Sequence, residues 1–257
     1  MKLISKIALT TCFALIAMGT LQAQQSIGAG TYTQNFDNIG NGLPDGFSLA
    51  IDATANTIGT PGATFATAAT SWGASTGNFR NVANADAGEM ASTADQENDL
   101  NRSLGLRQTG SFGDAGAAFN FNFSSSLAAV TSISIDLQML SVQGHSTSFA
   151  IQYGIGITPT NFTTLATYTD PGTFGLTNFT FTPANFGVNL DNQNSVYFRV
   201  VALEPSTGSG SRDTVGIDNL MVTATAIPEP SVYMLLGVGL LLCGQRFLRG
   251  RKSKPNT

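Results

Sequence analysis

The sequence predicts an all-β fold, a two-sheet antiparallel sandwich of jelly-roll type. In the stretch AFNFNF, the residues Phe119, Phe121 and Phe123 fall on one face of an extended strand, with asparagines on the other. Such period-two alternation is typical of strands that bury one face in a core. Turn signals rich in Gly, Pro, Asn and Asp separate such runs, and no stretch between the two ends of the chain has a helical period with caps.

The expected strands follow one another at short intervals, each rich in β-branched and aromatic residues. In the first half they are 31–36, 47–52, 63–68, 78–83, 100–108 and 117–123. In the second half they are 131–140, 148–157, 163–169, 177–182, 196–203 and 215–223. The clearest turn signals between them are Asn41-Gly42, Pro44-Asp45-Gly46, Pro61-Gly62 and Asp170-Pro171-Gly172. About a dozen strands with one polar face each fit two packed sheets.

The amino terminus has the features of an export signal, which we assign to residues 1–23. Lys2 and Lys6 form a short basic region, and an apolar run over 7–19 follows it. Ala23 offers a small residue at the cleavage point. The run is too short for a comfortable membrane span, so we expect a cleaved signal peptide and an exported protein.

The body, residues 24–226, is acidic and lacks cysteine. It holds 15 acidic residues, five arginines and no lysine, which gives a formal charge of −10. Binding to nucleic acid needs clustered cations, so this balance excludes nucleic acid as a partner. The two cysteines, Cys12 and Cys243, lie outside the body. Without a disulfide, its stability after export must come from core burial or bound ions.

The carboxyl-terminal segment, residues 227–257, combines an apolar run with a basic end. Residues 231–244 carry no charge and would span roughly 21 Å as a helix, less than the roughly 30 Å hydrocarbon core of a bilayer. The basic residues that follow are Arg246, Arg249, Arg251, Lys252 and Lys254. Their side chains can reach the headgroups and hold this end on the cytoplasmic side. We therefore expect an apolar helix that anchors the protein transiently in the inner membrane.

The order of Pro228-Glu229-Pro230, a short apolar helix and an arginine-rich end resembles the PEP-CTERM sorting signal of Gram-negative bacteria. The resemblance implies processing by an exosortase, a membrane transpeptidase. It also implies delivery to the cell surface or to the extracellular polysaccharide matrix. A similar tail is found on some proteins described as ice-binding. The alternative is an ordinary single-pass membrane anchor.

The body resembles secreted bacterial proteins with concanavalin-like and carbohydrate-binding jelly rolls. The stretches that carry the resemblance are LPDGFSL, RSLGLRQTGSFGDAGAAF, SFAIQYGIG and GSGSRDTVGIDNLMV. The last is similar to the closing strand of such jelly rolls, where an IDN or IDD step is common. The resemblance implies a fold and a secreted habitat, and it implies no reaction.

Two aspartates are candidate calcium ligands because of where the topology places them. Asp37 ends the first expected strand and Asp218 lies in the last, and these strands often lie near each other in a jelly roll. Both carboxylates, with Asn219 or backbone carbonyls, would suit calcium, which takes 6–8 oxygen ligands. Related carbohydrate-binding sandwiches hold a structural calcium in a similar place. The alternative is that these aspartates cap turns or accept hydrogen bonds from backbone amides.

Trp72, the only tryptophan, is the candidate ligand-binding residue, because an indole ring can stack on a sugar ring. The alternative is a partly buried structural role. His145, the only histidine, lies in a polar loop with no spacing that indicates a catalytic triad. The acidic loop 86–99 is interpreted as a solvated surface, with a calcium-binding loop or a catalytic carboxylate pair as the alternatives. Arg212-Asp213 is expected to form an internal ion pair that fixes the preceding Gly/Ser loop against the last strand.

Three functions are compatible with these observations. The first, which we favour, is a non-enzymatic surface or matrix protein whose sandwich binds glycans such as extracellular polysaccharide. The second is a secreted glycan-active enzyme, which would need two carboxylates facing each other across a cleft. The third is a purely structural matrix protein without a ligand.

Overall fold

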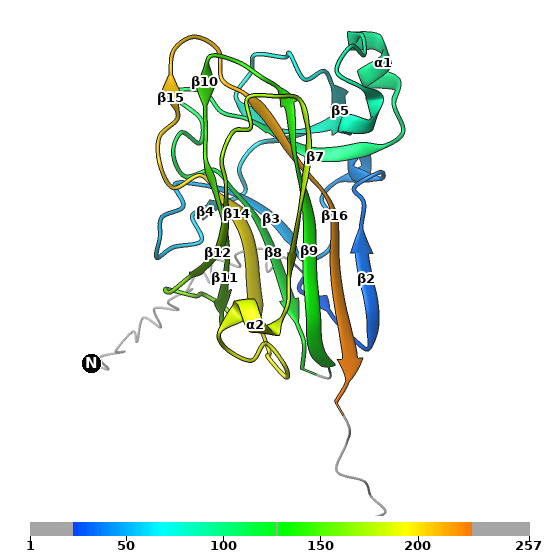
Figure 1. Ribbon diagram of the computed structural model, residues 1–257, viewed down its shortest axis with the longest axis vertical. Helices are drawn as coiled ribbons and strands as arrows, with labels where there is room; N and C mark the ends of the chain where they lie inside the picture. Colours follow the sequence, from blue (N-terminus) through cyan, green and yellow to red (C-terminus); the bar gives the residue numbers. More distant parts are fainter. Residues whose placement is uncertain (1–22, 127, 228–257) are drawn as a thin grey trace, which may run out of the picture.

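The protein folds as a β-sandwich, described by a computed structural model over residues 23–126 and 128–227. The first sheet, sheet A, has the order β12-β11-β14-β8-β3-β4, with β1 beside β8. The second, sheet B, has the order β13-β9-β16-β7-β6-β5, with β2 beside β16. A short ribbon of β10 and β15 lies at the end of the sandwich opposite the end of β16 (Figure 1). The predicted all-β two-sheet fold is therefore confirmed.

The strands of sheet A are β1 (Gln25–Ser26), β3 (Phe47–Ile51), β4 (Thr60–Pro61), β8 (Ala118–Ser124), β11 (Phe149–Ile155), β12 (Thr163–Tyr168) and β14 (Val196–Val201). Those of sheet B are β2 (Gly30–Gln34), β5 (Phe65–Thr70), β6 (Asn78–Ala83), β7 (Arg102–Arg107), β9 (Ala128–Ser141), β13 (Gly175–Phe181) and β16 (Thr214–Ala226). The ribbon consists of β10 (His145–Ser146) and β15 (Thr207–Gly208). Pairing is antiparallel except between β1 and β8 and between β5 and β6, which are parallel.

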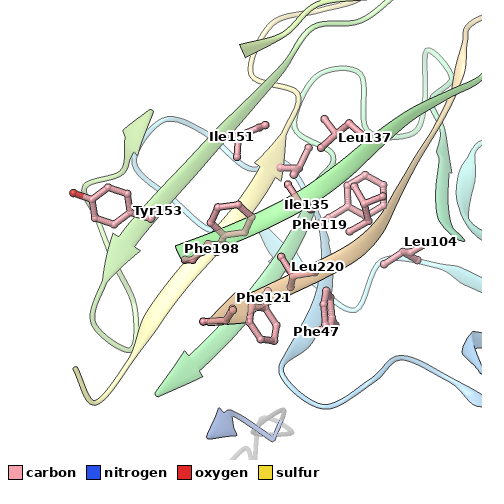
Figure 2. Packing of buried hydrophobic residues seen from close by; sticks show 14 of the residues in the cluster. Phe47, Leu104, Phe119, Phe121, Ile135, Leu137, Ile151, Tyr153, Phe198 and Leu220 are labelled. Carbon is pink, nitrogen blue, oxygen red and sulfur yellow. The ribbon is translucent and has the colours of Figure 1, made fainter. Parts of the chain in front are cut away.

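The core lies between the two sheets and follows the predicted alternation. Phe119, Phe121 and Phe123 on β8 are each 2% exposed or less. Ile135 and Leu137 on β9 reach toward them from sheet B (Figure 2). Burying a large apolar side chain contributes roughly 1.5–3 kcal/mol, so this shared inner layer is the main source of stability.

Short helices are the feature that the sequence pattern did not predict. The helix α1 (Thr93–Asn98) begins at a capping box in which Ser92 and Asp95 bond reciprocally, and α2 (Pro183–Phe186) begins with a proline. Two 3-10 turns, η1 (Ile39–Asn41) and η2 (Ala85–Ala87), lie between strands. Elements of three to six residues are too short to show a helical period, which explains why they were missed.

The features predicted at the two ends of the chain lie outside the described residues. At the amino end this is the signal peptide, and at the carboxyl end these are the Pro228-Glu229-Pro230 motif, the apolar run and the basic end. In the described part of the chain, no helix has the length and hydropathy that a membrane crossing requires.

A buried arginine holds a loop onto the outer face of sheet A. Arg199 on β14 is fully buried and donates to the carbonyls of Thr54 and Thr57 at 2.9 and 2.6 Å and to Gln152 Oε1 at 2.9 Å. Its guanidinium carbon lies 3.4 Å from the centre of the Phe162 ring. Burial lowers the pKa of Arg199 to about 10. Arg199 therefore fixes the 52–59 loop to sheet A. Backbone carbonyls, the Gln152 amide and the Phe162 ring surround its charge.

Replacing this arginine tests how much the loop depends on it. In Arg199→Leu, the buried acceptor Gln152 Oε1 loses its donor, which costs about 1–3 kcal/mol. The carbonyls of Thr54 and Thr57 belong to exposed residues and can bond to water instead. We therefore expect a midpoint of thermal unfolding lower by roughly 2–12 °C. The control is Glu204→Gln on an exposed position. An unchanged midpoint in Arg199→Leu would show that the loop is held by other contacts.

Candidate functional site

The candidate site is a shallow cavity of about 210 Å³ at the edge of sheet B. We call it the Asp37 pocket, and its lining residues are Asp37, Asn38, Gly40, Asn41, Ala69, Asn81, Asp99, Leu100 and Arg102. They come from the turn after β2, from β5 and β6, and from the connection between α1 and β7. The lining is thus mostly amide and carboxylate, with one exposed leucine.

The first wall of the Asp37 pocket follows β2. Phe36 adopts a positive φ of 56° and buries its ring completely in the core. Its backbone N–H donates to Gln34 Oε1 at 2.7 Å, which stabilises this turn. The reversal sends Asp37 and the η1 turn outward, so that Asn38 and Asn41 are exposed.

Arg102 joins the other walls. Its Nε donates to Asn81 Oδ1 at 2.6 Å, and its Nη1 donates to the carbonyls of Gln96 and Asp99 at 2.7 and 3.1 Å. Its backbone N–H donates to Asp37 Oδ1 at 3.0 Å. Arg102 is 4% exposed, and burial lowers its pKa. Its guanidinium is therefore a scaffold for the pocket and is not presented to solvent.

Three side chains of the Asp37 pocket are free for a ligand. Asn38 occupies the N-cap position of η1, yet its side chain makes no capping hydrogen bond. The amide of Asn41 also has no hydrogen-bond partner within the described residues. Leu100 is 85% exposed beside them. Amides offer both donors and acceptors, and a leucine offers an apolar contact, which together suit a hydroxylated ring.

Asp37 and Asp218, the predicted calcium ligands, lie within electrostatic reach of each other but are engaged elsewhere. Besides Arg102 N–H, Asp37 accepts Asn35 Nδ2 at 2.5 Å. Asp218, 1% exposed, accepts Asn219 N–H at 2.7 Å and the amide of Asn84. The described residues contain no group of three His, Cys, Asp or Glu side chains that could hold a metal ion. This geometry agrees with the alternative interpretation, in which both carboxylates accept amide hydrogens, and calcium at this pair stays a prediction.

Asp218 faces a second buried carboxylate across the sheet. Asp136 on β9 is its direct partner in the register between β9 and β16 and is 9% exposed. Asn178 and Asn219 donate to the two oxygens of Asp136 at 2.8 and 3.0 Å. Burial raises the pKa of Asp218 to about 7, the two amide donors oppose this, and the charges of Asp136 and Asp37 add to it. The pair is satisfied by asparagines and carries excess negative charge when Asp218 ionises.

Trp72 is not a sugar platform, which corrects its assignment as a ligand-binding residue. It is 3% exposed, its indole N–H donates to the Ala83 carbonyl at 2.9 Å, and its ring packs beside Phe174 with the ring centres 5.1 Å apart. It covers the outer face of sheet B together with Val82 and Leu140. An aromatic ring enclosed in this way has no face for a ligand.

The predicted pairing of Arg212 with Asp213 is wrong. Arg212 forms its ion pair with Asp114, with Nη2 2.6 Å from Oδ2, and Ser206 donates to the same carboxylate. Neighbours in extended backbone point to opposite sides, so adjacent opposite charges cannot face each other. Asp213 is left buried at 6% exposure.

A larger cavity of about 500 Å³ lies at the other end of the sandwich. It is lined by the first residues of β9, by α2 and by the 187–191 connection. Its polar side chains serve the fold, because Asp191 accepts the Val130 N–H at 2.9 Å and Asn189 accepts the Asp191 N–H at 2.7 Å. The Asp37 pocket is therefore the better site for a polar ligand.

Comparison with known proteins gives structural similarity only. The chain matches no protein-family model, and no curated protein matches it. The K3 cleaved adhesin domain of Lys-gingipain from Porphyromonas gingivalis is similar with a TM-score of 0.42 and 14% identity, over 76% of this chain and 99% of that one. A xylan-binding module, CBM15, is similar with a TM-score of 0.40 and 8% identity, over 78% of this chain and all of that one. No residue role is carried over from either.

The raised pKa of Asp218 makes stability depend on pH. The folded state holds a proton on Asp218 up to about pH 7, whereas the ordinary aspartate value is 3.8. Stability from this group is therefore complete below about pH 4 and is lost as pH rises through 7. In the presence of a chelator, we expect the unfolding midpoint to be several degrees higher at pH 5 than at pH 8.

Asp218→Asn isolates this contribution. Because the amide carries no charge, the unfolding midpoint of the variant should change less between pH 5 and pH 8 than that of the wild type. Asp45→Asn, at an exposed position, is the matched control. A wild-type midpoint that does not change between pH 5 and 8 would contradict the buried, ionisable state of Asp218.

Proposed function

We propose that the body is a non-enzymatic glycan-binding module that takes a sugar unit in the Asp37 pocket. The observation that carries this proposal is the convergence of the free amides of Asn38 and Asn41 with exposed Leu100 over a cavity of about 210 Å³. Such a cavity is smaller than the roughly 300–1,000 Å³ of drug-sized sites. Its size suits one ring of a polymer whose neighbouring units remain in solvent.

The charge of the pocket defines which glycans it favours. Asp37 and Asp99 contribute carboxylates, while the one cation, Arg102, is turned into the scaffold. The body carries a formal charge of −10. Neutral or amino-bearing sugars should therefore bind better than uronate-bearing chains, which this field repels.

The same contacts argue against catalysis in this pocket. A glycosidase needs one carboxyl group to transfer a proton and another to act as a base or nucleophile. Both oxygens of Asp37 already accept hydrogen bonds that hold the pocket together, and Asp99 Oδ1 accepts the Asn101 N–H at 2.8 Å. Binding without turnover is the chemistry that this arrangement supports.

Variants of the free side chains test the binding site. Asn38→Ala, Asn41→Ala and Leu100→Ser should each weaken binding about fivefold or more, since a lost hydrogen bond or apolar contact is worth about 1 kcal/mol. Affinity is measured against neutral, amino-bearing and uronate-bearing polysaccharides, and new reducing ends are assayed in the same samples. Met90→Ser, 93% exposed and outside the pocket lining, is the control. Unchanged affinity in all three variants would place binding elsewhere, and release of reducing ends would favour the glycan-active enzyme.

We further propose that the tail directs the protein to the cell surface or the extracellular matrix through exosortase processing. Support comes from the sequence alone, in the order of Pro228-Glu229-Pro230, the apolar run and the basic end. β16 ends at Ala226, so the motif begins two residues beyond the sandwich. A processing enzyme at the membrane would thus act beside a completed strand.

Cell fractionation tests this sorting proposal. A chain in which Pro228-Glu229-Pro230 is replaced by alanines should remain in the inner membrane at its precursor mass, because the processing enzyme no longer recognises it. Alanines at the exposed Glu204-Pro205 pair, which repeats two residues of the motif inside the body, give a control that should still be sorted. If the motif variant reaches the surface at the same mass as the wild type, the tail is an ordinary anchor.

A further inference from the structure

Four side chains from separate elements meet at the end of the sandwich that carries the β10–β15 ribbon. Ser146 belongs to β10, Tyr168 ends β12, Asp170 lies two residues later, and Asp213 directly precedes β16. We call these four residues the tip cluster. The ribbon lies far from Ala226, where the chain leaves the sandwich (Figure 1). The tip cluster is therefore separate from the tail and from the residues that line the Asp37 pocket.

Asp213 ties the ribbon to sheet B. Its Oδ1 accepts the Gln143 N–H at 2.6 Å, and its own N–H donates to the His145 carbonyl at 3.1 Å. The side chain is 6% exposed, and its second oxygen, Oδ2, has no hydrogen-bond partner among the described residues. A buried carboxylate oxygen without a partner bears the full cost of desolvation.

Tyr168 supplies a second unpartnered group in the same place. Its ring is 3% exposed, and its hydroxyl also has no hydrogen-bond partner among the described residues. Burial raises the pKa of Tyr168 to about 12, and the charges of Asp170 and Asp213 add to the rise. The hydroxyl therefore lies within electrostatic reach of both carboxylates and bonds to neither.

Asp170 completes the oxygen set. Its Oδ2 accepts Ser146 Oγ at 2.5 Å and its Oδ1 accepts the Gly172 N–H at 2.7 Å, so it is held in place by the turn and by the ribbon. Each carboxylate oxygen has a further lone pair to offer. Asp170 and Asp213 repel each other, and burial together with this repulsion raises the pKa of Asp213 to about 6.

The positive groups near Asp213 do not neutralise it by contact. Arg107 and His145 both stabilise its charge at a distance. Arg107, however, donates to Thr214 Oγ1 at 3.1 Å, and the His145 ring lies 3.4 Å from the Gly210 carbonyl. Among the described residues the ion pair within 4.0 Å is the one between Arg212 and Asp114. The carboxylates of Asp170 and Asp213 thus have no cation within 4.0 Å among the described residues.

We propose that the tip cluster binds a calcium ion through Asp213 Oδ2, Asp170, the Tyr168 hydroxyl and Ser146 Oγ. The donor set is entirely oxygen, which suits a hard cation and disfavours zinc, for which nitrogen and sulfur ligands are usual. The ion would give both unpartnered atoms a partner and cancel the repulsion between the carboxylates. Extracellular calcium modules typically have dissociation constants of about 10⁻⁴–10⁻³ M.

The tip cluster differs from the predicted pair Asp37 and Asp218 in one respect. At that pair every carboxylate oxygen already accepts an amide or backbone hydrogen. At the tip, amide donors are missing for Asp213 Oδ2. The proposed cation site thus lies at a buried carboxylate oxygen that has no hydrogen-bond donor among the described residues.

Thermal unfolding of the purified protein with calcium or with chelator tests the proposal. At 10 mM calcium, roughly 10–100 times the expected dissociation constant, the wild-type midpoint should rise by about 3–10 °C at pH 7.5. Asp213→Asn should lose most of this response, and Asp218→Asn should keep it. Tyr168→Phe, which removes only a hydroxyl, should fold and should bind calcium more weakly.

Terbium luminescence gives a second readout, because a tyrosine close to a bound terbium ion sensitises its emission. Excitation of the wild type should give emission that calcium displaces, and Tyr168→Phe should lose most of it, while Trp72→Phe should not. A calcium response lost in Asp218→Asn but kept in Asp213→Asn would overturn the proposal in favour of the Asp37 and Asp218 pair. A wild type that ignores calcium, with Asp213→Asn more stable at pH 7.5, would also overturn it and show that a proton fills the tip.

Discussion

The burial of arginines without ion pairs is the constraint on which this structure depends. Four of the five arginines of the body, Arg80, Arg102, Arg107 and Arg199, are buried, and none of them forms an ion pair within 4.0 Å in the described residues. Their hydrogen bonds go to backbone carbonyls, amide oxygens and a threonine hydroxyl. Hydrogen bonds to charged groups contribute about 1.5–3 kcal/mol each. The fold thus satisfies its buried charges with neutral dipoles.

This constraint explains why loops are fixed in this sandwich. A guanidinium presents five donors in a planar fork, so a single arginine can collect carbonyls from several segments. Arg102 gathers the end of α1 and β6, and Arg199 gathers the 52–59 loop and β11. Arg102 links the walls of the Asp37 pocket by hydrogen bonds while its own charge stays buried. A lysine, with three donors on a flexible stem, could not replace either residue.

The fold could be predicted from the sequence, whereas the partners of individual side chains could not. Alternation predicted the inner face of β8 because Phe119, Phe121 and Phe123 leave no other way to bury three rings. It could not show that Arg212 reaches Asp114, since the partner lies 98 residues away and only the folded loops bring the two together. Nor could it show that Trp72 is enclosed, because its cover includes Phe174, which is distant in sequence.

The strands β2 and β16 pair, as the topology argument for Asp37 and Asp218 expected, and the oxygens of both carboxylates accept hydrogen bonds. Topology did bring the two carboxylates within electrostatic reach. The donors to their oxygens come partly from residues close in sequence, Asn35 and Asn219, which the sequence could have indicated. The third, Asn84, arrives from the η2 turn, which no sequence pattern indicated.

The positions of hydrogen-bond donors also determine how buried aspartates are stabilised in this acidic domain. Asp136 and Asp218 stand opposite each other on adjacent strands, where like charges normally destabilise a sheet. Asparagines donate hydrogen bonds to both carboxylates and so reduce the cost of this pairing. Burial nevertheless raises the pKa of Asp218 to about 7. At the tip, Asp213 has one backbone donor and one unpartnered oxygen, so neutral dipoles do not suffice there. A body without lysine can complete such a site with a proton or with a cation from the medium.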